Sequence, residues 1–221
     1  MKHELFERID GYIDGLFAPS DPALDAAVAR TRKAGMPEIQ VSAGQGKFLY
    51  VLAKLVGARR ILELGTLGGY STIWLARALP ADGRLLTLEF SEKHAKVARE
   101  NIAGAGLAGK VEVVVGAALE TLPKLAAKAE PPFDMVFIDA DKGNYTAYLD
   151  LVVPMVRSGG LILADNVIRE GEVMEPEKHD GAAKGAAAFN AALAKDARVV
   201  AILLQQVGVK GHDGIAVVRV R

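Results

Sequence analysis

The chain has 221 residues, 51% of them hydrophobic, and its 27 basic residues are balanced by 27 acidic ones. This length fits a single domain with one sizeable core, and the balanced charge without a basic stripe disfavours a nucleic-acid binder. The absence of cysteine excludes disulfides and thiolate metal sites. A charged N-terminus and the lack of an apolar run of about 20 residues predict a cytoplasmic protein without a membrane span.

Three helices are predicted in the N-terminal part of the chain. The first has apolar residues at three- and four-residue steps between positions 5 and 16, which is typical of an amphipathic helix. The second is expected from Pro22 to about Lys33, and the third from near Gly46 to Gly57.

From residue 60 onward, apolar strands alternate with helical segments, as in a parallel sheet with helices on both faces. The expected strands are residues 60–64, 85–89, 111–115, 135–139, 161–164, 199–205 and 215–220. The glycines within residues 207–214 suit a hairpin, so the last strand is expected to lie antiparallel. The predicted fold is therefore α/β, a Rossmann-like doubly wound, seven-stranded mixed sheet with extra N-terminal helices, in a single domain of residues 1–221.

A glycine-rich turn follows the first expected strand. Residues 60–71 read RILELGTLGGYS, and the next helix is expected at residues 72–79. Glycines at such a turn let a ligand approach the backbone closely, and the helix N-terminus behind them offers unpaired N–H groups. The turn therefore predicts a cofactor site.

The spacing around this turn argues against a dinucleotide. A dinucleotide fingerprint that starts at Gly65 would need glycines in place of Leu67 and Tyr70, and Glu63 would repel a pyrophosphate. Glu89 ends the second expected strand, 24 residues after Gly65, where doubly wound folds hold a ribose diol. A nucleoside cofactor without phosphates is predicted, although other nucleotide-type ligands bind at similar turns.

Polar residues also follow two later strands. Asp139, Asp141 and Lys142 come at the end of one, and Asp165 and Asn166 at the end of the next. Taken singly, Asx residues often cap loops and most lysines are solvated. Together they offer carboxylate and amide oxygens at one edge of the sheet, which suits Mg²⁺, Mn²⁺ or Ca²⁺ better than zinc.

With these motifs in this order, the chain resembles the class I S-adenosylmethionine (SAM) methyltransferases. The motif of residues 63–71 is similar to the first motif of their divalent-metal-dependent small-molecule O-methyltransferases, the family of catechol and caffeoyl-CoA O-methyltransferases. The resemblance extends from about Val41 to the C-terminus. It implies a SAM cofactor, Mg²⁺ as the first choice of metal and a homodimer in which residues 1–58 cover the site and contribute dimer contacts, with no nucleic-acid or membrane partner.

The resemblance also implies roles for individual residues. The metal ligands match Asp139, Asp165 and Asn166, and the general base matches Lys142. The cofactor-binding positions match Val41, Glu63, Gly65, Ser71, Glu89, Ala117 and Asp139. In this mapping Glu63 and Ser71 face the methionine end, Glu89 binds the ribose hydroxyls and Ala117 lies beside the adenine. Asp141 matches in position without being a ligand, and we expect it to orient its loop.

These residues suggest a coherent reaction. A phenol has a pKa of about 10 and is a poor nucleophile at neutral pH. A divalent cation favours its ionisation, so that Lys142 has only to accept the proton, and two vicinal hydroxyls on one metal fix the reacting oxygen. We therefore expect methyl transfer from SAM to a hydroxyl of a vicinal dihydroxy aromatic acceptor. A non-catalytic SAM-binding protein and, less favoured, an NAD-type oxidoreductase are the alternatives.

Other conspicuous residues have simpler explanations. Trp74 follows the glycine turn and is expected to pack in the core rather than to stack on a cofactor. The four histidines lack metal-ligand spacing, so each is expected to be solvated and none is given a catalytic role; they are His3, His94, His179 and His212.

Overall fold

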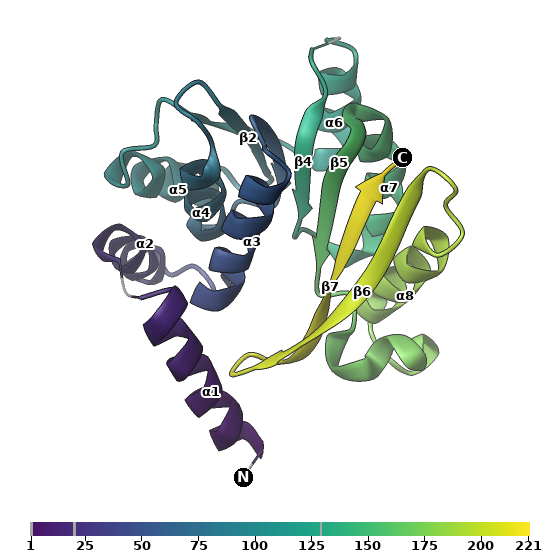
Figure 1. The fold of residues 1–221 in the computed structure, drawn as a ribbon, viewed down its shortest axis with the longest axis horizontal. Coiled ribbons are helices and arrows are strands. Elements are labelled where there is room, and N and C mark those ends of the chain that lie inside the picture. The colour runs from purple at the N-terminus through teal and green to yellow at the C-terminus, as the bar shows by residue number, and fades with distance from the viewer. Residues whose placement is uncertain (1, 20, 129) are drawn as a thin grey trace.

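The computed structural model describes residues 2–19, 21–128 and 130–221, which form a layered α/β structure (Figure 1). The helices are α1 (Lys2–Phe17), α2 (Pro22–Lys33), α3 (Ala43–Leu55), α4 (Tyr70–Ala78), α5 (Glu92–Gly104), α6 (Ala118–Ala126), α7 (Tyr145–Val152) and α8 (Gly181–Leu193). The strands are β1 (Arg60–Leu64), β2 (Arg84–Glu89), β3 (Val111–Val115), β4 (Phe133–Ile138), β5 (Val156–Asp165), β6 (Val199–Gly208) and β7 (Gly211–Val220). Short 3₁₀ turns are η1 (Lys142–Asn144), η2 (Val153–Met155), η3 (Arg169–Met174) and η4 (Pro176–Lys178). Within these described ranges, no helix is both long and apolar enough to cross a membrane.

The strands form one mixed sheet in the order β3-β2-β1-β4-β5-β7-β6. Strands β1 to β5 pair in parallel, and β7 pairs antiparallel with both β5 and β6. The predicted fold class, a doubly wound mixed sheet with an antiparallel last strand, is confirmed. Because strand order reverses between β1 and β4, the carboxyl ends of these two strands form the topological switch point at which such sheets bind ligands.

Two apolar cores lie on the two faces of the sheet. In β4, Met135 and Phe137 pack into the core on the side of α3, α4 and α5, whereas Val136 and Ile138 pack into the core on the side of α6, α7 and α8. All four side chains are fully buried. This burial on both faces explains why the sequence of β4 is almost continuously apolar rather than alternating.

The last hairpin is tighter than predicted. The strands were expected to be joined by a loop of residues 207–214, but β6 and β7 stay paired up to Gly208 and Gly211, with Val209 and Lys210 between them. Gly211 has a φ of +106°, which lets the chain reverse within so short a connection. The loop prediction was wrong because strand pairing continues through polar residues that have no strand-like pattern.

The third helix starts earlier than predicted. It begins at Ala43 instead of Gly46, because the Ser42 side chain accepts a hydrogen bond from Gln45 N (3.2 Å) and caps the N-terminus. Gly46 lies inside the helix, where a Cβ would come within 2.3 Å of Trp74 Cδ1. Trp74 itself is 8% exposed and belongs to the core, as its sequence position suggested.

The close packing of Gly46 against Trp74 yields a prediction about stability. Gly46→Ala is expected to destabilise the fold by about 1–3 kcal/mol, because overpacking against Trp74 outweighs the roughly 1 kcal/mol of helix propensity that alanine gains. Urea unfolding measures the change. The matched control is Gly15→Ala in α1, where nothing lies within 4 Å of the added Cβ, and this variant should be neutral or slightly stabilised. Equal stabilisation of both variants would argue against close packing at Gly46.

Candidate functional site

Two adjacent cavities open at the carboxyl ends of the parallel strands. The larger has a volume of about 720 Å³ and is lined by many of the predicted site residues, namely Val41, Gly65, Ser71, Glu89, Asp139, Lys142 and Asn166. The smaller, of about 470 Å³, is lined by Ala117 and shares Gly65, Glu89 and Ala140 with the larger. Glu63 and Asp165 are buried, with exposed fractions of 0% and 4%. The structure therefore brings most of the predicted residues to one cavity and places these two acids in its surroundings.

The glycine turn is forced by close packing at the switch point. Gly65 has a φ of +94°, and a Cβ there would lie 2.1 Å from the carbonyl oxygen of Asp139. Its N–H donates to Leu88 O at 3.0 Å, so the turn crosses the end of β2. Gly69, with a φ of +82°, then starts α4 at Tyr70, two residues before the predicted start. No side chain fits at Gly65, whose backbone packs against Asp139 and also lines the larger cavity.

Glu89 is held at the border between the two cavities. Its Oε2 accepts hydrogen bonds from Thr66 N (3.2 Å) and Leu67 N (2.8 Å), and its Oε1 accepts one from Ser91 N (2.9 Å). His94 Nδ1 lies 3.5 Å from the same Oε1. A carboxylate has about four acceptor positions, so Glu89 keeps capacity for a ligand hydroxyl while the glycine turn fixes its orientation.

Glu63 is a fully buried acid behind the cavity wall. Its Oε1 accepts a hydrogen bond from Ser71 Oγ (2.7 Å) and its Oε2 one from Thr72 Oγ1 (2.5 Å). Burial raises the pKa of Glu63 from 4.5 to about 7, although these hydroxyl donors oppose the shift. Ser71 lines the cavity and Glu63 does not. Glu63 therefore affects the cavity only by orienting the hydroxyl group of Ser71.

The smaller cavity has mostly apolar walls. Phe90, Ala117 and Leu119 line one part of it, and Asp141 and Tyr148 line another. The Tyr148 hydroxyl donates to Asp141, and burial together with this bond raises the pKa of Tyr148. Asp141 is therefore engaged with a tyrosine seven residues further along the chain, at the cavity edge.

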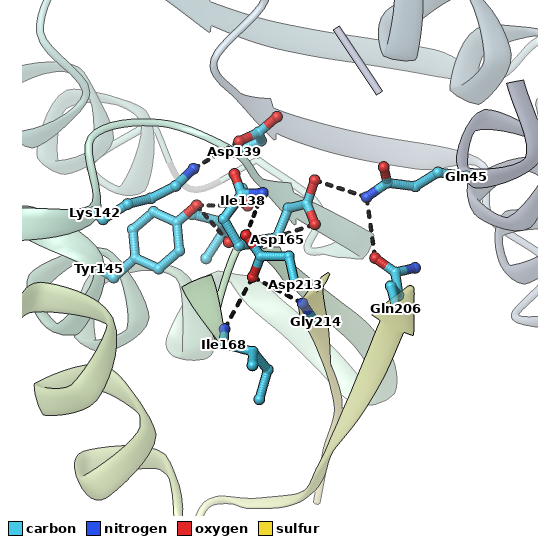
Figure 2. A network of polar contacts seen from close by, with 11 residues as sticks. Gln45, Ile138, Asp139, Lys142, Tyr145, Asp165, Ile168, Gln206, Asp213 and Gly214 are labelled. Atoms are coloured by element: carbon cyan, nitrogen blue, oxygen red, sulfur yellow. Dashed lines mark hydrogen bonds and ion pairs between the residues drawn. The ribbon is translucent and has the colours of Figure 1, made fainter. Parts of the chain in front are cut away.

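The metal-type residues gather at the carboxyl ends of β4 and β5, and Figure 2 shows Lys142 and Asp139 directed toward each other. Lys142 Nζ lies 2.7 Å from Asp139 Oδ1, and its side chain is only 11% exposed. The ring of Tyr145 lies 5.1 Å from the same Nζ, and the Tyr145 hydroxyl donates to the carbonyls of Ile138 and Asp165. Tyr145 thus ties the ends of β4 and β5 together behind the lysine.

Asp165 is a buried carboxylate with few partners. Its Oδ2 accepts a hydrogen bond from Gln45 Nε2 (2.7 Å) and its Oδ1 one from Asn166 N (2.9 Å). Burial and the nearby charge of Asp139 raise the pKa of Asp165 to about 7, while Lys142 opposes the shift. Two carboxylates in this neighbourhood repel each other, which makes a cation at this end of the cavity favourable.

Asn166 has an unusual backbone. Its φ is +56°, a left-handed conformation that asparagine tolerates better than most residues. Its Nδ2 donates to Asp213 Oδ2 at 3.1 Å, and Asp213 Oδ1 accepts hydrogen bonds from the N–H groups of Ile168 and Arg169. The loop after β5 is therefore clamped by Asp213, and Asn166 lines the larger cavity.

The donor set suits a hard cation. Asp139, Asp165 and Asn166 offer two carboxylates and one amide oxygen, the ligand type that Mg²⁺ or Mn²⁺ takes together with water or substrate oxygens. Over the described part of the chain, no group of three or more His, Cys, Asp or Glu residues is arranged to hold a metal ion. A cation at this position would thus depend on the amide of Asn166.

Sequence reasoning missed several residues of this site. Gln45 and Asp213 hold predicted residues, and His94 and Lys210 line the larger cavity. His94 was expected to be solvated; its side chain is 27% exposed, and α5 brings it beside Glu89 at the cavity wall. One weak signal was available, the position of His94 five residues after Glu89. The side chain of His3 lies outside the described residues.

Comparisons with known proteins identify the family and the fold. A family model described as O-methyltransferase matches residues 18–221. A catechol O-methyltransferase of Niastella koreensis is 51% identical over 221 residues, covering 100% of both chains. A catechol O-methyltransferase of Mycobacterium tuberculosis is 49% identical over 213 residues, covering 96% of this chain and 95% of its own. The crystal structure of an O-methyltransferase from Bacillus cereus in complex with SAH superposes with a TM-score of 0.96 at 45% identity, covering 99% of this chain and 100% of that one.

The buried Glu63 yields a prediction about stability and pH. Its folded-state pKa lies above the usual 4.5, so the folded protein holds a proton that the unfolded chain has lost, and stability falls as pH rises from about 4.5 to about 7. Glu63→Gln removes this titration. The free energy of unfolding of the ligand-free variant, relative to wild type, should therefore increase between pH 5 and pH 8, by up to about 3 kcal/mol.

Urea unfolding of both proteins at several pH values tests this expectation. Glu112→Gln, which changes an exposed glutamate on β3, is the control and should show no such trend. A constant difference between Glu63→Gln and wild type across the pH range would contradict the raised pKa.

Proposed function

Because this chain belongs to the O-methyltransferase family and is a SAM-dependent O-methyltransferase, we propose that it methylates one hydroxyl of a vicinal dihydroxy aromatic acceptor, of catechol or caffeoyl type, held by a divalent metal. Lys142 is the proposed general base. One observation carries this proposal: Asp139, Lys142 and Asn166 line the same cavity as the glycine turn and Glu89. A methyl donor and an acceptor can therefore share one enclosed volume.

The proposed cofactor contacts follow the two cavities. Val41, Gly65 and Ser71 would hold the methionine end in the larger cavity, and Glu89 would accept the ribose hydroxyls at the border. Ala117 would pack against the adenine in the smaller, apolar-walled cavity. The sulfonium of SAM carries a positive charge and supplies the methyl group when bound. Acidic side chains around the larger cavity favour such a cationic ligand.

The proposed metal ligands are Asp139, Asp165 and Asn166, with Mg²⁺ the first choice and Mn²⁺ or Ca²⁺ as alternatives. When bound, the metal acts as a Lewis acid that favours ionisation of the diol. The protein itself would hold the ligand side chains in place. Asp139 comes from the end of β4 and Asp165 from the end of β5, which are paired strands, so the donors are mounted on the rigid sheet rather than on a mobile loop.

Lys142 is well placed for proton transfer. Its Nζ lies at the cavity wall, held by Asp139 Oδ1 at 2.7 Å and flanked by the ring of Tyr145. An acceptor hydroxyl beside Asp139 would be within reach of this amine, which is the first requirement for a general base. Because the side chain is 11% exposed, few water molecules compete for the transferred proton.

We also propose a homodimer in which residues 1–58 supply contacts and cover the site. Apolar side chains of α1 remain exposed in the single chain, as expected for a surface that a second copy covers; the large ones are Leu5, Ile9, Tyr12, Ile13, Leu16 and Phe17. Figure 1 shows α1 projecting from the body of the molecule next to the tip of the β6–β7 hairpin. There Val209 N donates to Asp10 at 2.7 Å, which anchors the helix beside the site.

The first test is transfer of labelled methyl from SAM to catechol, caffeate and caffeoyl-CoA, with Mg²⁺ and again with EDTA. Transfer to at least one acceptor is expected, and EDTA should abolish it because the metal holds the diol. Asp139→Asn should lose Mg²⁺-dependent turnover by about 10²-fold or more, since it weakens a ligand that positions the acceptor.

Asp141→Asn is the matched control for that variant. Asp141 lies two residues away on the same loop and bonds to Tyr148 and Asn144, so the dependence on Mg²⁺ concentration should stay as in wild type. Transfer that survives EDTA, or an Asp139→Asn enzyme with undiminished turnover, would reject the metal site.

The role of Lys142 leads to a separate expectation. Lys142→Met should lower kcat by about 10²- to 10⁴-fold, the usual contribution of a general base, with little change in SAH affinity. Activity should partly recover at alkaline pH, where the diol ionises without help. Steady-state rates from pH 6 to pH 10 measure both effects, and a variant with a wild-type pH profile and rate would show that the lysine is not the base.

A further inference from the structure

The antiparallel strand β7 begins at the site edge of the sheet. Because it runs opposite to β5, the start of β7 lies beside the carboxyl end of β5, with Ile215 in register with Asp165. Asp213, two residues earlier in β7, therefore reaches the loop that follows Asp165. Figure 2 shows Asp213 next to Asp165 and Ile168, and Gln45 approaching Asp165 from the other side.

Asp213 determines which way the Asn166 amide faces. An ionised carboxylate only accepts hydrogen bonds, so the Asn166 group that meets Asp213 Oδ2 at 3.1 Å must be the NH₂. The amide oxygen is then directed away from Asp213. Asp213 Oδ1 meanwhile accepts hydrogen bonds from Ile168 N (3.0 Å), Arg169 N (2.9 Å) and Gly214 N (2.8 Å), so the carboxylate is itself held by the loop it clamps.

Gln45 fixes the orientation of the Asp165 carboxylate, as Asp213 does for the Asn166 amide. Its Nε2 donates to Asp165 Oδ2 at 2.7 Å and approaches Gln206 Oε1 at 3.4 Å. Both partners are acceptors, which fixes the NH₂ of Gln45 toward them. The Asp165 carboxylate, 4% exposed, is thereby held by α3 on one side and by its own backbone neighbour, Asn166 N, on the other.

We propose that Asp213 and Gln45 are positioning residues of the metal site, with Asp213 presenting the amide oxygen of Asn166 to the cation and Gln45 fixing the carboxylate of Asp165. This inference rests on the proposed metal dependence. It assigns part of the site to two segments other than the carboxyl ends of the parallel strands, namely the N-terminal turn of α3 and the start of β7.

Metal affinity tests the inference without relying on turnover. Binding of Mn²⁺ to the SAH-loaded protein is measured from the EPR signal of free Mn²⁺, for wild type, Asp213→Asn and Gln45→Leu. Each variant should bind Mn²⁺ about 10- to 100-fold more weakly, as is usual when a partner of a metal ligand is lost. SAH affinity should stay within about threefold of wild type, since both residues act at the metal end of the cavity.

A double variant separates orientation from simple loss of charge. In Asn166→Asp with Asp213→Asn, the two side chains exchange roles: the amide now donates to the carboxylate, whose other oxygen faces the cavity. Mn²⁺ affinity should recover to within about tenfold of wild type. Asp10→Asn is the matched control, because Asp10 also accepts a backbone N–H from the β6–β7 hairpin, at Val209, and it should leave Mn²⁺ affinity unchanged.

Several outcomes would overturn the inference. Wild-type Mn²⁺ affinity in both Asp213→Asn and Gln45→Leu would show that the ligands need no such support. Equal weakening in Asp10→Asn and Asp213→Asn would point to a general effect of the hairpin, as would a double variant no better than Asp213→Asn. If the wild-type protein binds SAH but no Mn²⁺ at millimolar concentration, the proposed metal dependence fails and this inference fails with it.

Discussion

The contact between Gly65 and Asp139 is the constraint on which the site depends. The carbonyl oxygen of Asp139 occupies the place where a side chain on residue 65 would begin, 2.1 Å from the position of its Cβ. Asp139 N also donates to Leu64 O at 2.9 Å, so β1 and β4 stay paired to their last residues. The glycine turn that would bind a cofactor and the carboxylate that would bind a metal are therefore neighbours by virtue of strand pairing. A methyl donor and its acceptor need this proximity, because fixing two reactants side by side removes much of the entropic barrier to their reaction.

Electrostatics is the second unifying feature of the site. Glu63 and Asp165 are both buried, and burial raises the pKa of each to about 7. Each acid is costly to ionise in the empty protein, and a cation bound nearby would lower that cost because it favours the charged carboxylate. Glu63 binds Ser71, which lines the larger cavity, and Asp165 directly precedes Asn166, which lines the same cavity. Such acids favour a cationic ligand, whereas the phosphates of a dinucleotide would meet repulsion. The family membership agrees with this and decides against the NAD-type oxidoreductase that sequence alone left open.

Much of the fold could be predicted because the strands are buried on both faces and read as continuous apolar runs. The rule that ligands bind at strand ends then led to Asp139, Asp165 and Asn166, which the structure brings to one end of the sheet. The sequence does not reveal which remote segments lie close together in the folded chain. Gln45 is an ordinary polar residue in the first turn of a helix, yet it contacts a carboxylate 120 positions later. The start of α3 was misplaced at Gly46 for another reason, because the capping signal of Ser42, which accepts from Gln45 N, was overlooked.

The antiparallel last strand explains why such remote residues meet at the site. In an all-parallel sheet, each strand brings only its carboxyl end to the ligand edge. Strand β7 runs the other way and brings its amino-terminal end there. The turn residue Lys210 therefore lines the cavity, and Asp213 follows three residues later. The short hairpin carries β6 to the same edge, where Gln206 approaches Gln45. At the tip of the β6–β7 hairpin, Val209 N donates to Asp10 of α1, and His212 N donates to Glu170 of η3 at 2.6 Å. The first helix, the loop after β5 and the last two strands thus share one small region, in which Asp213 connects β7 with Asn166.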